Sequence, residues 1–150
     1  MILKGLDEFV EAFLFCYNKY MENYQWYQSL IKPSFAPPSW VFGPAWTILY
    51  ILIAISFGKV ALLWSQGKIG WLIALPFILN LIFNFAFTPL QFGIQNLNLA
   101  SIDILLVLGT LIWAMIVIYP YAPWVTYINI PYLLWVSFAT IVQLSINFLN

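Results

Sequence analysis

Long apolar segments without charge dominate the chain after its first 32 residues. The uncharged stretches are residues 33–58, 69–102 and 104–150. A helix needs about 20 apolar residues to cross a hydrocarbon core of about 30 Å, so the two longer stretches exceed one straight crossing each. Pro89 and Gly93 interrupt one of them, and Pro120 and Pro123 interrupt the other. The pattern predicts four membrane-spanning helices, at about residues 40–64, 69–91, 99–119 and 126–148.

These spans indicate an all-α membrane protein. They are continuously apolar and lack the in-and-out alternation of a transmembrane barrel. Short loops join them, so consecutive helices are expected to be antiparallel neighbours in one bundle. Pro76 and Pro131 lie inside spans and predict kinks, because proline removes a backbone donor. Neighbouring helices can satisfy the carbonyl groups that these prolines leave free.

The first 24 residues have an amphipathic pattern instead. Apolar residues recur at steps of three and four, which places them on one face of a helix at about residues 3–24. Asp7, Glu8 and Glu11 lie on the opposite face, and each would cost about 2.5–3.5 kcal/mol at the centre of the hydrocarbon. We favour a short or shallow helix packed on the bundle. The alternative is a full first crossing with the acids near one end. No cleavable signal peptide is visible.

The composition narrows the possible functions. Hydrophobic residues make up 64% of the chain and charged residues 7%, against about 25% charged residues in soluble domains. The five basic residues are all lysines, too few for a nucleic-acid surface. Histidine is absent and Cys16 is the single cysteine, which excludes histidine catalysis, an internal disulfide and a cysteine-rich metal site. We expect an integral, multi-pass protein of the lipid bilayer, with no catalytic residues and no obligatory cofactor.

Two polar residues inside the expected spans are informative. Asn84 lies at about mid-depth, where an amide must hydrogen-bond within the bundle, as interhelical glue or as a ligand anchor. Asp103 is the only charged residue after Lys68, and a carboxylate inside a membrane indicates a function such as proton coupling. Because Asp103 lies about one turn into its expected helix, near the interface, we favour a structural role for it.

Aromatic residues make up 20% of the chain, and many lie in one recognisable segment. Residues 26–50 read WYQSLIKPSFAPPSWVFGPAWTILY. This segment resembles the signature of the TspO/MBR family, the translocator or tryptophan-rich sensory proteins. Residues 83–93 (FNFAFTPLQFG) and 131–140 (PYLLWVSFAT) resemble the family's third and fifth helices. The resemblance covers about residues 26–150. It implies a bundle of five transmembrane helices, often dimeric, with a pocket for porphyrins such as protoporphyrin IX.

Physical reasoning supports such a pocket independently. A planar, mostly apolar macrocycle needs flat aromatic walls and a few polar anchors. Trp46 and Tyr50 are four residues apart and share a helix face, and we expect Trp46 and Asn84 to hydrogen-bond the ligand's polar groups. The expected ligand-binding residues are Pro38, Trp40, Trp46, Tyr50, Asn84, Phe87, Trp135, Phe138, Ala139 and Gln143.

The chain departs from the family pattern in ways that bear on chemistry. Phe87 stands where the third helix commonly has Trp, and Asn147 stands where the fifth helix commonly has a late Trp. These changes argue against porphyrin breakdown that depends on tryptophan. The Tyr-and-Arg sterol pattern of animal members is absent, because the chain has no arginine.

Three functional classes follow from these observations. A sensor or carrier that binds a porphyrin-type ligand is favoured over a light-dependent porphyrin-degrading enzyme. The third class is a regulatory membrane partner without its own ligand, for which the acidic face of the first segment would be the supporting feature. Ala54 and Gly58 form a small-xxx-small pattern, which is weak support for a homodimer.

Overall fold

The computed structural model describes residues 11, 14, 18, 22–23 and 25–150. Two compact units are distinguished: residues 1–31 with residue 150, and residues 32–149. In the first unit, residues 25–29 are helical, beyond the helix end expected at residue 24. The side chain of Asn150 pairs with the main chain of Ile31 through two hydrogen bonds of 2.9 Å. Most of the amphipathic helix expected at 3–24, and the choice between its two interpretations, lie outside the described residues.

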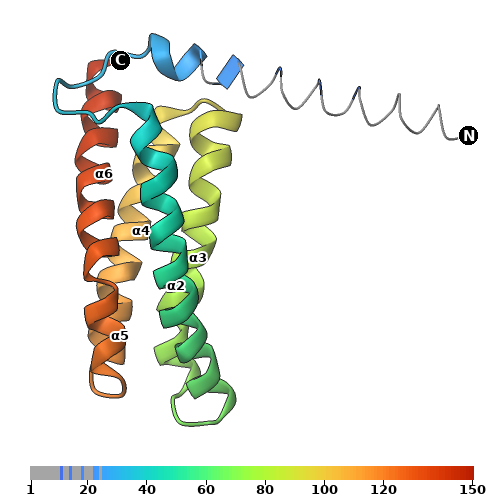
Figure 1. The fold of residues 1–150 in the computed structure, drawn as a ribbon, viewed down its shortest axis with the longest axis vertical. Helices are drawn as coiled ribbons and strands as arrows, with labels where there is room; N and C mark the ends of the chain where they lie inside the picture. Colours follow the sequence, from blue (N-terminus) through green and yellow to red (C-terminus); the bar gives the residue numbers. More distant parts are fainter. Residues whose placement is uncertain (1–10, 12–13, 15–17, 19–21, 24) are drawn as a thin grey trace, which may run out of the picture. The chain divides into compact units, whose positions relative to one another are not determined.

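The second unit is a bundle of antiparallel helices (Figure 1). In chain order its elements are η1 (Ser39–Val41), α2 (Phe42–Ser65), α3 (Trp71–Thr88), η2 (Pro89–Gly93), α4 (Leu97–Ile118), α5 (Pro123–Ile128) and α6 (Ile130–Leu149). Among the described residues, the segments long and apolar enough to cross a membrane are Ser39–Ser65, Trp71–Gly93, Leu97–Ile118 and Pro123–Leu149. The helical membrane bundle expected from the hydrophobic pattern is therefore confirmed.

Local chemistry explains where the helices begin and end. After α2, Gly67 adopts a φ of 67°, and the backbone N–H of Lys68 donates to the carbonyl of Leu63 at 2.9 Å. A left-handed glycine at this position satisfies carbonyl groups at a helix end. At the start of α4, the side chain of Asn96 accepts a hydrogen bond from the backbone N–H of Leu99 at 3.0 Å. This N-cap satisfies one of the helix's unpaired donors.

The helix expected over residues 126–148 is broken in the structure. α5 ends at Ile128 and α6 begins at Ile130, with Asn129 between them. Pro131 explains the break, because its ring removes a backbone donor and crowds the carbonyl group four residues earlier. Asn129 compensates inside the bundle: its side chain donates to the carbonyl of Val125 at 2.7 Å and accepts from Ser56 Oγ at 3.4 Å. Pro76, by contrast, lies inside α3 without dividing it.

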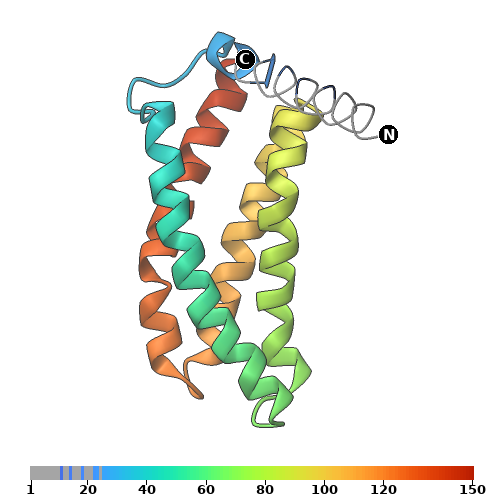
Figure 2. The same cartoon turned by 45° about the vertical axis from the view of Figure 1, so that its right-hand side comes forward.

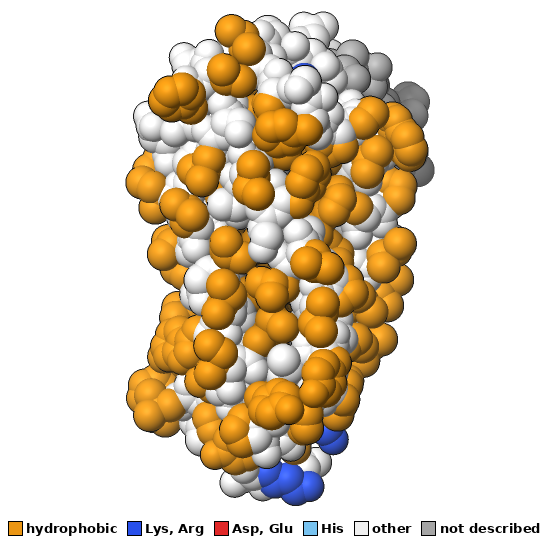
Figure 3. Space-filling view, turned by 90° about the vertical axis from the view of Figure 1, so that its left-hand side faces the viewer, with side chains coloured by type: hydrophobic (Ala, Val, Ile, Leu, Met, Phe, Trp, Pro, Cys, Tyr) orange, Lys and Arg blue, Asp and Glu red, His pale blue; other side chains and the backbone are white. Residues whose placement is uncertain are grey.

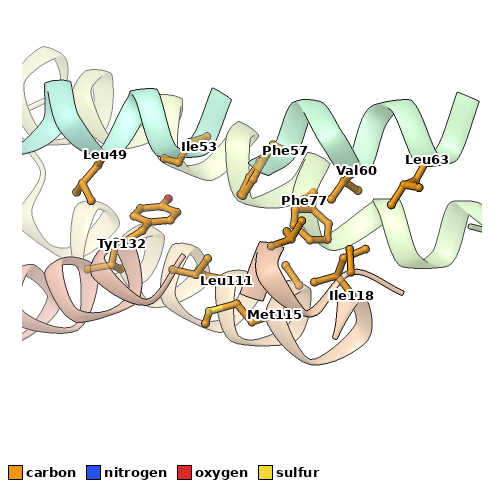
Figure 4. Packing of buried hydrophobic residues seen from close by; sticks show 14 of the residues in the cluster. Leu49, Ile53, Phe57, Val60, Leu63, Phe77, Leu111, Met115, Ile118 and Tyr132 are labelled. Carbon is orange, nitrogen blue, oxygen red and sulfur yellow. The ribbon is translucent and has the colours of Figure 1, made fainter. Parts of the chain in front are cut away.

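A hydrophobic core fills the space between the helices (Figure 4). The rings of Phe57 on α2 and Phe77 on α3 meet edge to face, with centroids 4.8 Å apart. Leu111 and Ile118 on α4 are completely buried. The helix α4 packs extensively on both α3 and α6, while α2 crosses the bundle obliquely and meets α3 near the loop that joins them (Figure 2). The bundle is therefore built around α4.

The outward-facing surface of the bundle is apolar. Large side chains on several helices are well exposed, for example Ile116 on α4 at 67% and Leu134 on α6 at 66%. Hydrophobic side chains cover the length of the face in Figure 3, and basic side chains gather mainly near one end. Such continuous exposure suits lipid tails rather than water. Together with the four candidate spans, it identifies an integral, multi-pass membrane protein.

Candidate functional site

A series of hydrogen bonds connects α2, α3 and α6 in the interior of the bundle. The Tyr50 hydroxyl donates to Asn84 Oδ1 at 2.9 Å. Asn84 Nδ2 donates to the Tyr132 hydroxyl oxygen at 2.8 Å, and the Tyr132 hydroxyl donates to Asn80 Oδ1 at 3.0 Å. Asn80, Asn84 and Tyr132 are all buried. Asn80 and Asn84 lie four residues apart on α3, so both amides face the Tyr132 hydroxyl from one side of that helix.

The same series continues from Asn80 to α4. Asn80 Nδ2 donates to the carbonyl of Val107 at 2.9 Å and to Thr110 Oγ1 at 3.1 Å. Thr110 Oγ1 in turn donates to the carbonyl of Leu106 at 2.7 Å, so the series ends on the α4 backbone. We call the side chains of Tyr50, Asn84, Tyr132, Asn80 and Thr110 the interhelical network. It places hydrogen-bonding side chains from four helices in one connected group.

The two ends of the interhelical network differ in access. Toward the α4 end, Asn80 of α3 is completely buried and Thr110 of α4 is also buried. At the α2 end, the Tyr50 side chain is 39% exposed. The partly exposed end of the interhelical network is therefore Tyr50 on α2. The amides of Asn80 and Asn84 are buried and hydrogen-bonded to other side chains. Tyr50 is hydrogen-bonded to Asn84 and is also partly exposed.

Aromatic rings surround the accessible end of the interhelical network. The ring of Trp46 lies 5.4 Å from that of Tyr50 and 6.4 Å from that of Tyr132, and the second pair meets edge to face. The ring of Phe85 stacks nearly parallel to that of Tyr50, with centroids 6.2 Å apart. These contacts form one aromatic surface that spans α2, α3 and α6.

A second aromatic group lies between α2 and α6. The ring of Trp135 on α6 meets that of Phe42 on α2 edge to face at 5.9 Å, and that of Phe138 at 6.1 Å. The indole N–H of Trp135 is buried and has no hydrogen-bond partner. An unpaired buried donor is costly, and a bound acceptor would remove that cost.

The structure brings together some of the residues expected at the ligand site. Tyr50 and Asn84 belong to the interhelical network, and the ring of Trp46 contacts that of Tyr50. Trp135 and Phe138 belong to the second aromatic group, between α2 and α6. Phe87 and Ala139 are half-buried. Trp40 in η1 is 74% exposed, and Pro38 is exposed beside it, so both lie apart from the buried groups. The ligand-binding roles of all these residues stay predictions.

Gln143 occupies a different environment from the aromatic residues. Its Nε2 donates to Gln91 Oε1 at 2.9 Å, and both side chains are buried. Gln91 lies in η2, the single π-helical turn that begins at Pro89. The turn is closed by the N–H of Ile94, which donates to the carbonyl of Pro89 at 2.8 Å. Gln143 therefore joins α6 to the end of the α3 segment.

Replacing Gln143 with leucine is expected to destabilise the bundle by about 1 kcal/mol, because the amide of Gln91 loses its buried partner. The double variant Gln91→Leu/Gln143→Leu is expected to recover most of this loss, since neither amide is then left unpaired. Unfolding of the purified variants in detergent, followed by circular dichroism, measures both values. A double variant as unstable as the sum of the two single variants would contradict the pairing.

Sequence reasoning missed several residues of these groups. Tyr132 is central to the interhelical network, yet the sequence presented it only as part of the PYLLW segment. Asn80 was visible as a polar residue inside a span, and its spacing of four from Asn84 was the available signal. Phe42 and Phe85 gave no signal that separates them from lipid-facing aromatic residues.

Two further observations on the described residues concern metal binding and a surface groove. Among the described residues, no group of three or more His, Cys, Asp or Glu side chains is placed to hold a metal ion. A surface groove of about 800 Å³ lies at the C-terminal end of α6, away from the aromatic groups. Its lining residues are Pro33, Leu144, Ser145, Asn147, Phe148 and Leu149. None of the expected ligand-binding residues lines this groove.

Comparisons with known proteins agree with these features. The TspO/MBR family model matches residues 9–149. The tryptophan-rich protein TspO of Archaeoglobus fulgidus is 35% identical, over 68% of this chain and 72% of its own length. The translocator protein of Homo sapiens is 34% identical over 71% of this chain and 70% of its own. The tryptophan-rich sensory protein of Cereibacter sphaeroides is 35% identical over 68% and 69%, respectively. The chain therefore belongs to the TspO/MBR family.

Proposed function

We propose that this protein binds porphyrins such as protoporphyrin IX, or similar apolar ring ligands, among α2, α3 and α6, and acts as a sensor or carrier. The observation that carries the proposal is the buried, unpaired indole N–H of Trp135 among aromatic rings. Flat rings match a planar macrocycle, and the free donor matches an acceptor on it. Relatives named translocator protein and tryptophan-rich sensory protein support a carrier or a sensor.

The interhelical network supplies the polar part of the proposed site. The oxygen and the nitrogen of an amide can each make two hydrogen bonds, and Asn84 uses one at each in the protein. Asn84 thus keeps capacity for a ligand group, as its expected anchoring role requires. Trp46, in ring contact with Tyr50, brings its own indole donor to the same region.

Tyr50 gives the proposed site a means of sensing. A ligand acceptor that binds the Tyr50 hydroxyl competes with Asn84 Oδ1 for its proton. When Asn84 loses this partner, its amide becomes free to reorient, and its bond to Tyr132 changes with it. Since the network reaches the α4 backbone through Asn80, occupancy near α2 can alter contacts across the bundle.

Titration with protoporphyrin IX in the dark, followed by tryptophan fluorescence, tests the proposal on the purified full chain. We expect saturable quenching, and about tenfold weaker binding for Trp135→Phe, Trp46→Phe and Asn84→Ala, which corresponds to about 1.4 kcal/mol for each lost anchor. The control is Trp71→Phe, at an exposed position at the start of α3.

Each outcome of the titration has a distinct meaning. Saturable quenching that none of the three variants weakens would keep porphyrin binding and move its site elsewhere. Linear, non-saturating quenching would overturn the proposal and favour a regulatory partner without a ligand. The same titration under illumination, with analysis of pigment products, separates binding from porphyrin degradation.

A further inference from the structure

Asp103 is buried inside a membrane-spanning helix. It follows Leu97, the first residue of α4, by six residues, a rise of about 9 Å. Its side chain is 4% exposed, and its Oδ2 atom is buried without a hydrogen-bond partner. The expectation of a position about one turn into the helix is corrected, because α4 begins at Leu97 and not near residue 99. Asp103 lies nearly two turns into α4 and within the packed bundle.

The face of α4 on which Asp103 lies is known from its neighbours. Residues three or four apart share a helix face, which aligns Asp103 with Val107 and Thr110. Both of these residues accept hydrogen bonds from Asn80 of α3. Asp103 is therefore on the side of α4 that packs on α3, about two turns before Thr110 of the interhelical network. It does not lie on the lipid-facing side with Ile102 and Leu106, whose side chains are exposed.

The helices around Asp103 offer no compensating positive charge. The elements that pack on α4 are α3, η2, α5 and α6. α3 and η2 contain no titratable side chain, and the titratable groups of α5 and α6 are the phenols of Tyr127 and Tyr132. The Tyr132 hydroxyl is already engaged with Asn80 and Asn84. The cations among the described residues, Lys32, Lys59 and Lys68, all lie outside these four elements.

We propose that Asp103 is a proton-binding site of the bundle, whose carboxyl group carries a proton at neutral pH. An ionised carboxylate in this setting would be buried and partly unpaired, and none of the described lysines lies in an element packed on α4, which makes the charge strongly unfavourable. A hard metal cation needs six or more oxygen ligands, and the described residues place no acidic cluster there. One proton on the carboxyl group makes it neutral, and that proton returns to the aqueous phase when the site empties.

The proposal goes beyond the proposed function and does not rest on porphyrin binding. Its consequence is a defined dependence of stability on pH. Below about pH 4, where Asp103 is protonated in both the folded and the unfolded chain, the bundle keeps its full stability; the loss extends from there up to the pH at which the folded bundle releases the proton. Between these two pH values the unfolded chain has released the proton and the folded bundle still holds it, so stability falls as pH rises; above the folded-state value both states are ionised and this dependence ends.

Infrared spectroscopy of the full chain in lipid nanodiscs tests the proton directly. At neutral pH we expect a C=O stretching band of a protonated carboxylic acid that shifts on transfer to heavy water. Asp103→Asn is expected to remove this band, and Glu22→Gln, at an exposed position, is expected to leave it in place. A wild-type spectrum without a protonated-acid band overturns the proposal, and so does a band that persists in Asp103→Asn.

Thermal unfolding at a series of pH values provides a second test, because the wild type and Asp103→Asn are expected to respond differently to pH. The unfolding midpoint of the wild type is expected to fall as pH rises from about 4 to neutral, whereas that of Asp103→Asn is expected to change much less over this range. Asparagine resembles the neutral acid, so the variant is expected to match the wild type near pH 4 and to be the more stable of the two at neutral pH. Equal pH dependence in the two proteins overturns the proposal. If the variant does not fold, the pH titration of the wild-type infrared band decides the question.

Discussion

Replacing Phe77 with alanine is expected to lower the free energy of unfolding of the bundle by about 3 kcal/mol. Phe77 is buried in the core, and its ring meets that of Phe57 edge to face at 4.8 Å. The substitution removes this ring contact and leaves a cavity between α2 and α3. Lipid cannot fill that cavity without displacing the helices. Denaturant unfolding in mixed micelles, followed by circular dichroism, measures the change.

Two control variants separate packing from a general effect of substitution in α3. Phe77→Leu keeps most of the side-chain volume, and we expect a loss of about 1 kcal/mol. Ile82→Ala changes a side chain that is exposed on the same helix, and lipid can refill the space, so its effect is expected to be small. If Ile82→Ala proves as costly as Phe77→Ala, the core in Figure 4 does not hold α2 on α3.

Asn80→Ala is the variant with the second-largest expected effect, a loss of about 2 kcal/mol. The substitution removes the partner of the Tyr132 hydroxyl on α6 and the donor to Val107 and Thr110 on α4. A single interhelical hydrogen bond in a membrane averages about 0.6 kcal/mol. Three bonds together with the lost packing of a fully buried side chain account for the larger value. The same unfolding assay applies.

Matched variants test whether the connected network produces this loss. Tyr132→Phe removes only the hydroxyl and leaves Asn80 Oδ1 and Asn84 Nδ2 without it, so we expect a loss of about 1 kcal/mol. Asn98→Ala removes an asparagine whose bond to Asn147, at 3.1 Å, is exposed, and its expected effect is close to zero. Similar losses for Asn80→Ala and Asn98→Ala would show that burial of the network contributes little.

The proposed ligand site and the proposed proton site lie in different parts of the bundle. The aromatic groups join α2 to α6, whereas Asp103 lies on the α3-facing side of α4. The interhelical network extends from Tyr50 to the helix face that also carries Asp103. Measurement of porphyrin affinity for Asp103→Asn therefore shows whether the two sites are independent.

The sequence alone determined that the chain forms several apolar helices and that these helices lie in a membrane. Uncharged apolar runs interrupted by Pro89, Gly93, Pro120 and Pro123 predicted the helices, because backbone groups in hydrocarbon must be satisfied within a helix. The family followed from the segment Trp26–Tyr50 and is confirmed by the match over residues 9–149. The break at Asn129 was not predicted. Pro131 indicated a kink, but the hydrogen bond that Asn129 accepts from Ser56 of α2 depends on how the helices pack.

Side-chain partners were decided by the tertiary structure alone. Asn84 was predicted to hydrogen-bond inside the bundle, but its partners Tyr50 and Tyr132 lie 34 and 48 residues away. In a span that is apolar on every side, the hydrophobic pattern does not mark which face turns inward. The sequence therefore could not place Asp103 against α3 or separate Trp135, with its buried N–H, from the exposed Trp113. Those distinctions depend on how the helices rotate about their axes, and packing between helices sets that rotation.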